Sequence, residues 1–245
     1  MNEDVGEVQA TWALVLDGAT APPLETGCVH GVRWYVDQLS RELRTRLSSD
    51  GTMPLPDMLA ESIRAVTESH ASTCDTANPS SPSSTVSLVR ERSGELDYLV
   101  LADSPVILDV DGEVRPVLDD RIDHLPAYDL DTVTRVRNTD AGFWVASTDP
   151  TAAYRAVSGS TPLNQVRRVA LASDGATRLV DVFGLLDWAG LLDLCTPPEG
   201  DPRGLITRTR AAEDDPTTSV LPGARRAKGH DDATVIALDY REAHA

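Results

Sequence analysis

The chain alternates short apolar runs with acidic residues, and this pattern predicts buried strands that carry a carboxylate at one end. An apolar run of four to eight residues bounded by turn residues is typical of a strand in a sheet interior. The runs and their acidic neighbours are 12–16 before Asp17, 96–102 before Asp103, 168–172 before Asp174 and 233–238 after Asp231. A simple turn would explain one such run, but four together predict that the carboxylates converge.

Two amphipathic segments follow the first predicted strand. Over residues 31–47 apolar side chains recur every three or four positions, with Arg and Glu between them, which predicts a helix. Residues 55–70 show the same spacing behind two prolines, and Asp57 is predicted to be the N-cap. Further helices are predicted over 150–157, 179–194 and 203–213.

The middle of the chain is predicted to be rich in strands. The predicted strands there are 85–91, 96–102, 106–110, 114–117 and 143–146. Tight turns at 93–95 and 111–112 separate neighbouring strands, which predicts an antiparallel meander. Residues 118–140 are acidic and irregular, and we interpret them as an excursion or flap.

The order of these elements predicts an α+β fold with mainly antiparallel sheet. The 245 residues are 41% hydrophobic and 25% charged, which is ample for a globular core. We find no second domain and therefore expect a single domain over residues 1–245.

Charge and cysteine content narrow the class of protein. The net charge of −17 argues against a partner such as nucleic acid or an anionic membrane surface. Three cysteines without a Cys-x-x-Cys pair suggest a reducing compartment. No apolar stretch approaches the length of a membrane span, and the N-terminal residues do not resemble a signal peptide. We therefore expect a cytoplasmic protein.

Converging aspartates point to a hard cation. Mg²⁺ and Mn²⁺ prefer carboxylate, backbone carbonyl and water oxygens. Two ions that share one bridging carboxylate would suit hydrolysis of a phosphoryl group. Glu3 and Asp4 lie a few residues before the first strand, and a hairpin there would place both beside Asp17, so both are candidate metal ligands.

Five short motifs, in this order, resemble those of the metal-dependent protein phosphatases (PPM, or protein phosphatase 2C). The family pattern runs Glu-Asp, Asp-Gly, Gly-Asp-Ser, Ser-Asp-Gly and Asp-Asn-hydrophobic-Thr-Val. The matching residues here are Glu3-Asp4, Asp17-Gly18, Ala102-Asp103-Ser104, Ser173-Asp174-Gly175 and Asp231-Asp232-Ala233-Thr234-Val235. The resemblance implies a four-layer α-β-β-α sandwich of two antiparallel sheets flanked by helices.

The resemblance also implies roles for the acidic residues. Asp17 would bridge two Mn²⁺ or Mg²⁺ ions, and the Gly18 carbonyl would bind one of them. Asp174 and Asp231 would bind the other, Glu3 would act through water, and Asp103 with Asp174 would form a third site. A water bridging the ions would attack phosphoserine, phosphothreonine or a related small phosphorylated molecule in line, with Asp17 and Asp174 as catalytic residues.

The chain departs from the family pattern in the residues that read the substrate. The family's phosphate-binding Arg would fall before Met1, and the Gly-rich segment with a His that follows the first Asp-Gly is missing. The candidate substitutes for the Arg are Arg33, Arg178, Arg225, Arg226 and Lys228. His30, at the start of the first predicted helix, is the candidate general acid.

Two other interpretations stay open. The departures would suit a catalytically weak phosphatase-like domain that binds or regulates a phosphorylated partner. Separately, Cys28-x-His30 and His70-x₃-Cys74 lie near predicted helix ends, and four nitrogen and sulfur ligands would suit structural zinc. The spacing of these four residues fits no standard zinc motif.

Overall fold

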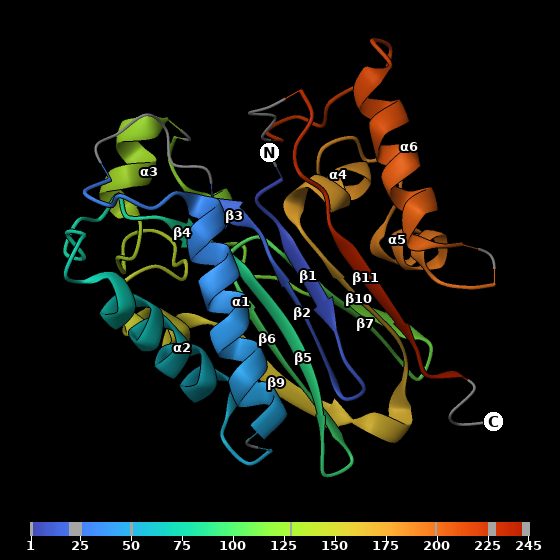
Figure 1. Ribbon diagram of the computed structural model, residues 1–245. Coiled ribbons are helices and arrows are strands. Elements are labelled where there is room, and N and C mark those ends of the chain that lie inside the picture. Colours follow the sequence, from blue (N-terminus) through green and yellow to red (C-terminus); the bar gives the residue numbers. More distant parts are fainter. Residues whose placement is uncertain are drawn as a thin grey trace.

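Two antiparallel sheets stacked face to face form the centre of the protein (Figure 1). The computed structural model describes residues 2–19, 26–49, 51–127, 129–198, 200–224 and 229–241. In spatial order, the first sheet contains β1 (Val5–Val8), β2 (Trp12–Leu16), β5 (Val86–Arg92), β6 (Glu95–Leu101) and β9 (Val157–Pro162). The second contains β11 (Val235–Asp239), β10 (Val166–Ala172), β7 (Val106–Val110) and β8 (Glu113–Val117).

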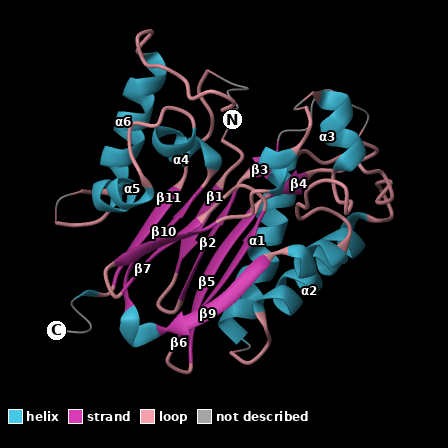
Figure 2. Ribbon diagram, turned by 180° about the vertical axis from the view of Figure 1, so that it is seen from behind, coloured by secondary structure: helices cyan, strands magenta, loops and turns pink. Residues whose placement is uncertain are grey.

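Helices cover the outer face of each sheet (Figures 1 and 2). Helices α1 (Val32–Ser49) and α2 (Leu55–His70) pack on the first sheet. Helices α4 (Asp174–Asp181), α5 (Trp188–Cys195) and α6 (Pro202–Asp214) pack on the second. This arrangement confirms the predicted α+β class and its four-layer α-β-β-α sandwich. Among the described residues, no helix is long and apolar enough to cross a membrane.

Strand β2 shows why its sequence is apolar without interruption. Successive side chains of a strand point to opposite faces. Leu14 and Leu16 contribute to the core beneath α1 and α2, whereas Ala13 and Val15 contribute to the core between the sheets. All five residues of β2 are buried because both faces of the sheet are covered. Burying one such leucine contributes roughly 1.5–3 kcal/mol.

The predicted helices over 31–47, 55–70 and 203–213 are confirmed as α1, α2 and α6. The N-cap prediction for Asp57 is wrong. Pro54 occupies the N-cap position of α2 and makes no side-chain capping hydrogen bond. Asp57 lies in the first turn, where its negative charge interacts favourably with the positive end of the helix dipole.

For the stretch from 143 to 162, one prediction is wrong and another is confirmed only in part. Residues 143–146 form no strand and make only isolated bridges, such as that between Ala146 and Ser84. The predicted helix at 150–157 is a 3₁₀ helix, Pro150–Arg155, and is followed by the unpredicted edge strand β9. Five of the six residues of β9 are exposed and Val157 is its only aliphatic side chain, so its sequence lacks the apolar signal of a buried strand.

The predicted meander is also wrong, because the chain changes sheets between β6 and β7. The β5–β6 and β7–β8 hairpins form as expected, but each belongs to a different sheet. The crossing segment is Ala102-Asp103-Ser104-Pro105, so Asp103 lies where the two sheets meet. Ala102 adopts a left-handed backbone conformation with φ of +67°, at the position where the family pattern has Gly.

The predicted flap, residues 118–140, is partly helical. It contains the 3₁₀ helix Arg121–His124 and the short helix α3 (Leu130–Val136). Ile122 packs with Phe143 and Val145 against Ala102 in a small separate core. This segment therefore supports the crossing between the sheets.

The left-handed Ala102 gives a test of the crossing segment. An L-residue in this region costs about 1–2 kcal/mol, and glycine removes that cost but loses about 0.4–1 kcal/mol through a more flexible unfolded chain. Ala102→Gly is therefore expected to raise the free energy of unfolding by about 0.5–1 kcal/mol, measured by urea denaturation. Gly94→Ala is the matched control, because Gly94 has φ of +81° with open space around it. It should lose about 1 kcal/mol, and a loss in both variants would contradict this account.

Candidate metal centre

The N-terminal hairpin places two acidic residues opposite Asp17 and Gly18. Strands β1 and β2 pair with Val5 opposite Leu16, and continuing that register puts Asp4 opposite Asp17 and Glu3 opposite Gly18. A Cβ on Gly18 would lie 2.8 Å from Glu3 Cβ and 2.6 Å from Val32 Cγ1, so only glycine permits this approach. The predicted hairpin and its acidic pair are confirmed.

Asp17 is the carboxylate that the other acidic residues share. Burial raises its pKa well above the usual value, and the negative charges of Asp174, Asp4 and Asp103 raise it further. These three residues come from α4, the N-terminal segment and the crossing between β6 and β7. Two of the aspartates predicted to converge with Asp17, Asp103 and Asp174, are therefore close enough for their charges to act on it.

Asp4 has a buried oxygen that the protein does not satisfy. Ser173 Oγ donates to Asp4 Oδ2 at 2.9 Å, but Asp4 Oδ1 is buried and makes no hydrogen bond. Burial raises the pKa of Asp4, and the charge of Asp232 adds to the effect, although Ser173 and Thr234 partly offset it. Buried carboxylate oxygens normally have a partner, so this orphaned oxygen suits a nearby cation.

The start of α4 packs tightly against the segment before β11. A Cβ on Gly175 would lie 1.9 Å from the Asp232 carbonyl oxygen and 3.3 Å from Asp231 Cβ. The Ser173 amide donates to the Thr234 carbonyl, and the Thr234 amide donates to Ser173 Oγ, both at 2.9 Å. These contacts hold the start of α4, which carries Asp174, against residues 231–234.

The N-terminal segment is joined to the same place by a side chain that sequence reasoning missed. The amide of Glu3 donates to Asp232 Oδ2 at 2.7 Å. Asp232 stands where the family pattern has Asn, and its role is to hold the backbone of Glu3. A carboxylate here adds negative charge that the family pattern lacks.

A buried ion-pair network holds the Asp231 segment from behind. Glu213 of α6 lies fully buried between Arg178 and Arg210. Arg210 donates to the Asp231 carbonyl, and Arg178 Nη1 donates to the Gly229 carbonyl at 3.3 Å. The Arg178 side chain is only 5% exposed, so its placement favours a supporting role over the predicted phosphate contact.

Hydroxyl groups link Asp17 to the crossing segment. The Asp17 amide donates to Thr85 Oγ1 at 3.2 Å, and Thr85 Oγ1 lies 2.6 Å from Ser104 Oγ. Ser104 follows Asp103, so the network fixes both acidic positions through their backbone. Thr85 could not be found from sequence, because its value depends on the pairing of strands far apart in the chain.

Asp119 supports the other side of the crossing. Its Oδ2 accepts from the Ala102 amide at 2.8 Å, and both of its oxygens bind the Arg121 guanidinium. Asp119 therefore supports the left-handed backbone of Ala102, the residue before Asp103. In the sequence it was one of several acids in the flap, and nothing set it apart.

Among the candidate cations that the structure describes, Arg33 contacts the N-terminal acidic segment. Its Nη1 donates to the carbonyls of Asn2 at 3.0 Å and Asp4 at 3.1 Å, while Nε binds Asp37. The side chain is 40% exposed, so solvent and small anions reach it. Arg225, Arg226 and Lys228, the other candidates, lie outside the described residues.

The contacts of His30 do not support its predicted role as the general acid. Its ring stacks on Trp34 at 3.8 Å between centroids and meets the edge of His70 at 6.0 Å. These contacts group His30 with the cysteine-containing segments and do not favour it as a general acid at Asp17.

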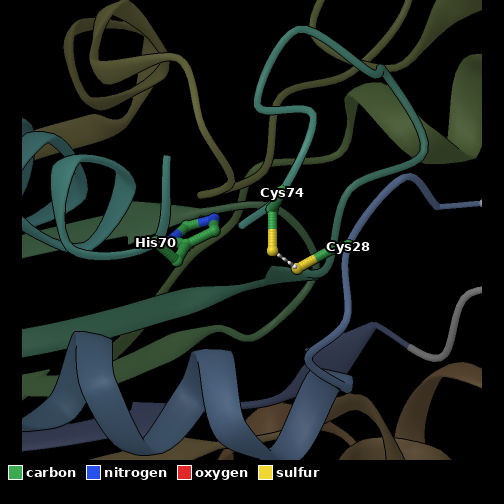
Figure 3. A group of neighbouring side chains, drawn as sticks. All are labelled: Cys28, His70 and Cys74. Atoms are coloured by element: carbon green, nitrogen blue, oxygen red, sulfur yellow. Dashed lines mark hydrogen bonds between the residues drawn. The ribbon is translucent and has the colours of Figure 1, made fainter. Parts of the chain in front are cut away.

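The cysteines of the zinc interpretation do come together with one histidine. The ligand atoms of Cys28, His70 and Cys74 lie within 4.8 Å of one another, without His30 (Figure 3). No three carboxylates of the described residues are this close. The cysteine–histidine group is therefore more compact than the acidic one.

The donors around Asp17 are all hard oxygens, and they fit Mn²⁺ or Mg²⁺. Asp17, Asp174, Asp231 and the Gly18 carbonyl would hold two ions, with Glu3 and Asp4 at the edge. The negative charge of Asp103 also acts on Asp17. A two-sheet sandwich with acidic residues at the ends of its strands is what the resemblance to the metal-dependent phosphatases implied.

The comparisons with known proteins agree with this class. The family model for protein phosphatase 2C matches residues 4–197. The chain belongs to the protein phosphatase 2C family. No curated protein matches the chain in sequence.

Solved bacterial phosphatases share the fold. The serine/threonine phosphatase PstP/Ppp of Mycobacterium tuberculosis is 18% identical, with a TM-score of 0.56 over 98% of this chain and 92% of that chain. The PstP catalytic domain in complex with two manganese ions is 19% identical, with a TM-score of 0.59 over 98% and 91%. PppA of Pseudomonas aeruginosa, a regulatory component of the T6SS, is 16% identical, with a TM-score of 0.57 over 97% and 90%.

The raised pKa of Asp17 predicts that the metal centre destabilises the protein when no cation is present. A carboxyl whose pKa is higher in the folded state contributes stability at low pH that is lost as pH rises through that pKa. In EDTA at pH 7, Asp17→Asn is therefore expected to raise the free energy of unfolding by about 1 kcal/mol or more. The wild type should also lose more stability than the variant as pH rises.

Saturating Mn²⁺ should reverse this order, because a ligand present at 100 times its Kd stabilises the folded state by about 2.7 kcal/mol. Asp120→Asn, at an exposed carboxyl, is the control and should change neither measurement. A less stable Asp17→Asn variant in EDTA would contradict the argument.

Proposed function

We propose that this protein is an Mn²⁺- or Mg²⁺-dependent phosphatase that hydrolyses phosphoserine and phosphothreonine. The observation that carries the proposal is the buried Asp17, with the charges of Asp4, Asp103 and Asp174 directed at it, in a protein phosphatase 2C fold. Like charges at this density repel one another, and a bound cation would neutralise them. Bound divalent ions would supply a nucleophilic water at neutral pH and polarise the phosphoryl oxygens.

The residues of the chain supply position and charge for this reaction. Asp17 lies directly after β2, Asp174 acts on it from the start of α4, and Asp231 lies in the segment before β11. Gly18 allows the backbone of Glu3 to approach. Because the carboxylates come from rigid elements of both sheets, the reacting phosphoryl group would meet a fixed constellation.

Arg33 is our candidate for holding the phosphoryl group. It extends from the first turn of α1 to the backbone of Asp4 and remains partly exposed. A guanidinium binds phosphate oxygens through two parallel hydrogen bonds, which a lysine cannot reproduce. The phosphoryl group would take the place of Asp37, whose carboxylate pairs with Nε and Nη2 of Arg33 in this structure. Arg33 would thereby replace the missing N-terminal Arg of the family pattern.

The substrate is expected to be a phosphorylated protein, and a small phosphorylated molecule is the alternative. PstP is a serine/threonine phosphatase, which favours the first. The three cysteines of the chain are free thiols, which suits a cytoplasmic location.

The direct test is hydrolysis of p-nitrophenyl phosphate and of a phosphothreonine peptide, with Mn²⁺ and with EDTA. Turnover is expected only with the metal, and Asp174→Asn should lower kcat/KM about 1,000-fold, because it removes a carboxylate of the cluster. Asp193→Asn is the control, since Asp193 pairs with Arg168 near the opposite end of β10. It should retain wild-type activity.

If Mn²⁺ binds by calorimetry while neither substrate turns over, the proposed activity is wrong. The alternative, a phosphatase-like domain that binds a phosphorylated partner, then stands. If neither Mn²⁺ nor Mg²⁺ binds, the inferred metal site of converging aspartates is wrong.

The role of Arg33 predicts a parallel loss of substrate and phosphate binding. Arg33→Gln should lower kcat/KM about 10–100-fold and raise the inhibition constant of inorganic phosphate by a similar factor. Arg44→Gln is the matched control on the same helix, at an exposed arginine beside Glu7. A lower kcat/KM with an unchanged phosphate inhibition constant would show that Arg33 only supports the N-terminal segment.

A further inference from the structure

Three soft metal ligands from separate segments meet beside the start of α1. Cys28 precedes α1, His70 is the last residue of α2, and Cys74 lies in the turn that follows α2 (Figure 3). Their ligand atoms lie within 4.8 Å of one another, and the two sulfurs are 3.1 Å apart. Within the described part of the chain, no other three His, Cys, Asp or Glu residues are grouped so closely.

His70 is held in the orientation and tautomer that a metal ligand requires. Its Nδ1 lies 2.7 Å from the Val66 carbonyl, which can only accept, so Nδ1 carries the proton. The remaining nitrogen, Nε2, therefore has a lone pair to give. Metal-binding histidines typically donate their other ring nitrogen to a carbonyl or carboxylate in this way. The ring is only 3% exposed and meets the edge of Trp34 at 5.2 Å, which fixes its plane.

The two cysteines are fixed by backbone contacts of their own. The Val29 amide donates a hydrogen bond to Cys74 Sγ at 3.4 Å. A hydrogen bond of this kind would stabilise a thiolate at Cys74. The Cys28 amide donates to Thr26 Oγ1 at 3.2 Å, which shapes the turn that carries the first sulfur. Both side chains are half-buried, whereas Cys195, the third cysteine, is fully buried in the helical layer.

We propose that Cys28, His70 and Cys74 form a second metal site, for a thiophilic divalent cation such as Zn²⁺, with solvent in the fourth position. The chemistry of these donors differs from that of the carboxylate centre, because thiolate and imidazole select Zn²⁺ over Mg²⁺ and Mn²⁺. A buried histidine with a fixed lone pair would be superfluous in a disulfide, so the third ligand favours a metal over a redox pair. This inference is independent of the proposed phosphatase activity.

The site would fix the segment that leads into the carboxylate centre. It joins residues 26–31 to the end of α2, and α1 begins immediately afterwards with Val32 and Arg33. Val32 packs against Gly18, and Arg33 binds the carbonyl of Asp4. A cation at the cysteines would therefore act as a structural support for the first turn of α1.

The test uses Co²⁺ as a spectroscopic probe of thiolate ligation in the reduced, full-length protein. Co²⁺ bound to sulfur gives an intense charge-transfer absorption that oxygen ligands do not give. The wild type should show this absorption with one equivalent of Co²⁺, and Zn²⁺ should displace it. Cys74→Ser should abolish the absorption and His70→Gln should weaken Co²⁺ binding at least about tenfold.

Two control variants separate this site from the rest of the protein. Cys195→Ala removes the remaining cysteine and should leave the absorption unchanged, as should Asp174→Asn at the carboxylate centre. Circular dichroism shows whether Cys74→Ser is folded. If this variant is not folded, a second measurement needs no substitution. In the wild type, Zn²⁺ should protect two thiols from an alkylating reagent.

Three outcomes would overturn the proposal. The first is an absence of the charge-transfer absorption in the reduced wild type. The second is an equal loss of absorption in Cys195→Ala. The third is a protein that binds no Zn²⁺ and whose mass, without reductant, shows the loss of two hydrogens through a bond between Cys28 and Cys74.

Discussion

Repulsion between carboxylates at Asp17 is the constraint on which the rest of the structure depends. Burial and the charges of Asp174, Asp4 and Asp103 all oppose ionisation of Asp17. A folded chain keeps such groups together only if other contacts hold their backbones in place. The hairpin, the two close glycines and the hydrogen bonds between Ser173 and Thr234 supply those contacts. The repulsion lowers the stability of the folded protein, and a bound divalent cation would offset that loss.

The supporting contacts reach the acidic residues through the main chain. Thr85 accepts from the Asp17 amide, Arg210 donates to the Asp231 carbonyl, and Asp232 accepts from the Glu3 amide. Buried Glu213 in turn fixes Arg210. This ion pair therefore positions the backbone of Asp231 through its carbonyl. This division of labour lets rigid elements orient the carboxylates while metal binding is left to their oxygens.

The sequence predicted what periodicity and local chemistry determine. The apolar runs predicted the buried strands, the amphipathic spacing predicted α1 and α2, and the acidic residues at strand ends predicted that Asp103 and Asp174 converge on Asp17. The sheet change after β6, the exposed strand β9 and the burial of Arg178 could not be predicted. Each depends on which distant segments pair or pack together, and that information lies in no local pattern.

Strand β2 contributes side chains to two cores, and this has a consequence for cooperativity. Its alternate residues join the layer of α1 and α2 to the space between the sheets. Neither sheet can separate from its neighbour without exposing one face of β2 to water. The two halves of the sandwich therefore unfold as a unit, and the amide hydrogens of this strand exchange with solvent only when the whole molecule opens.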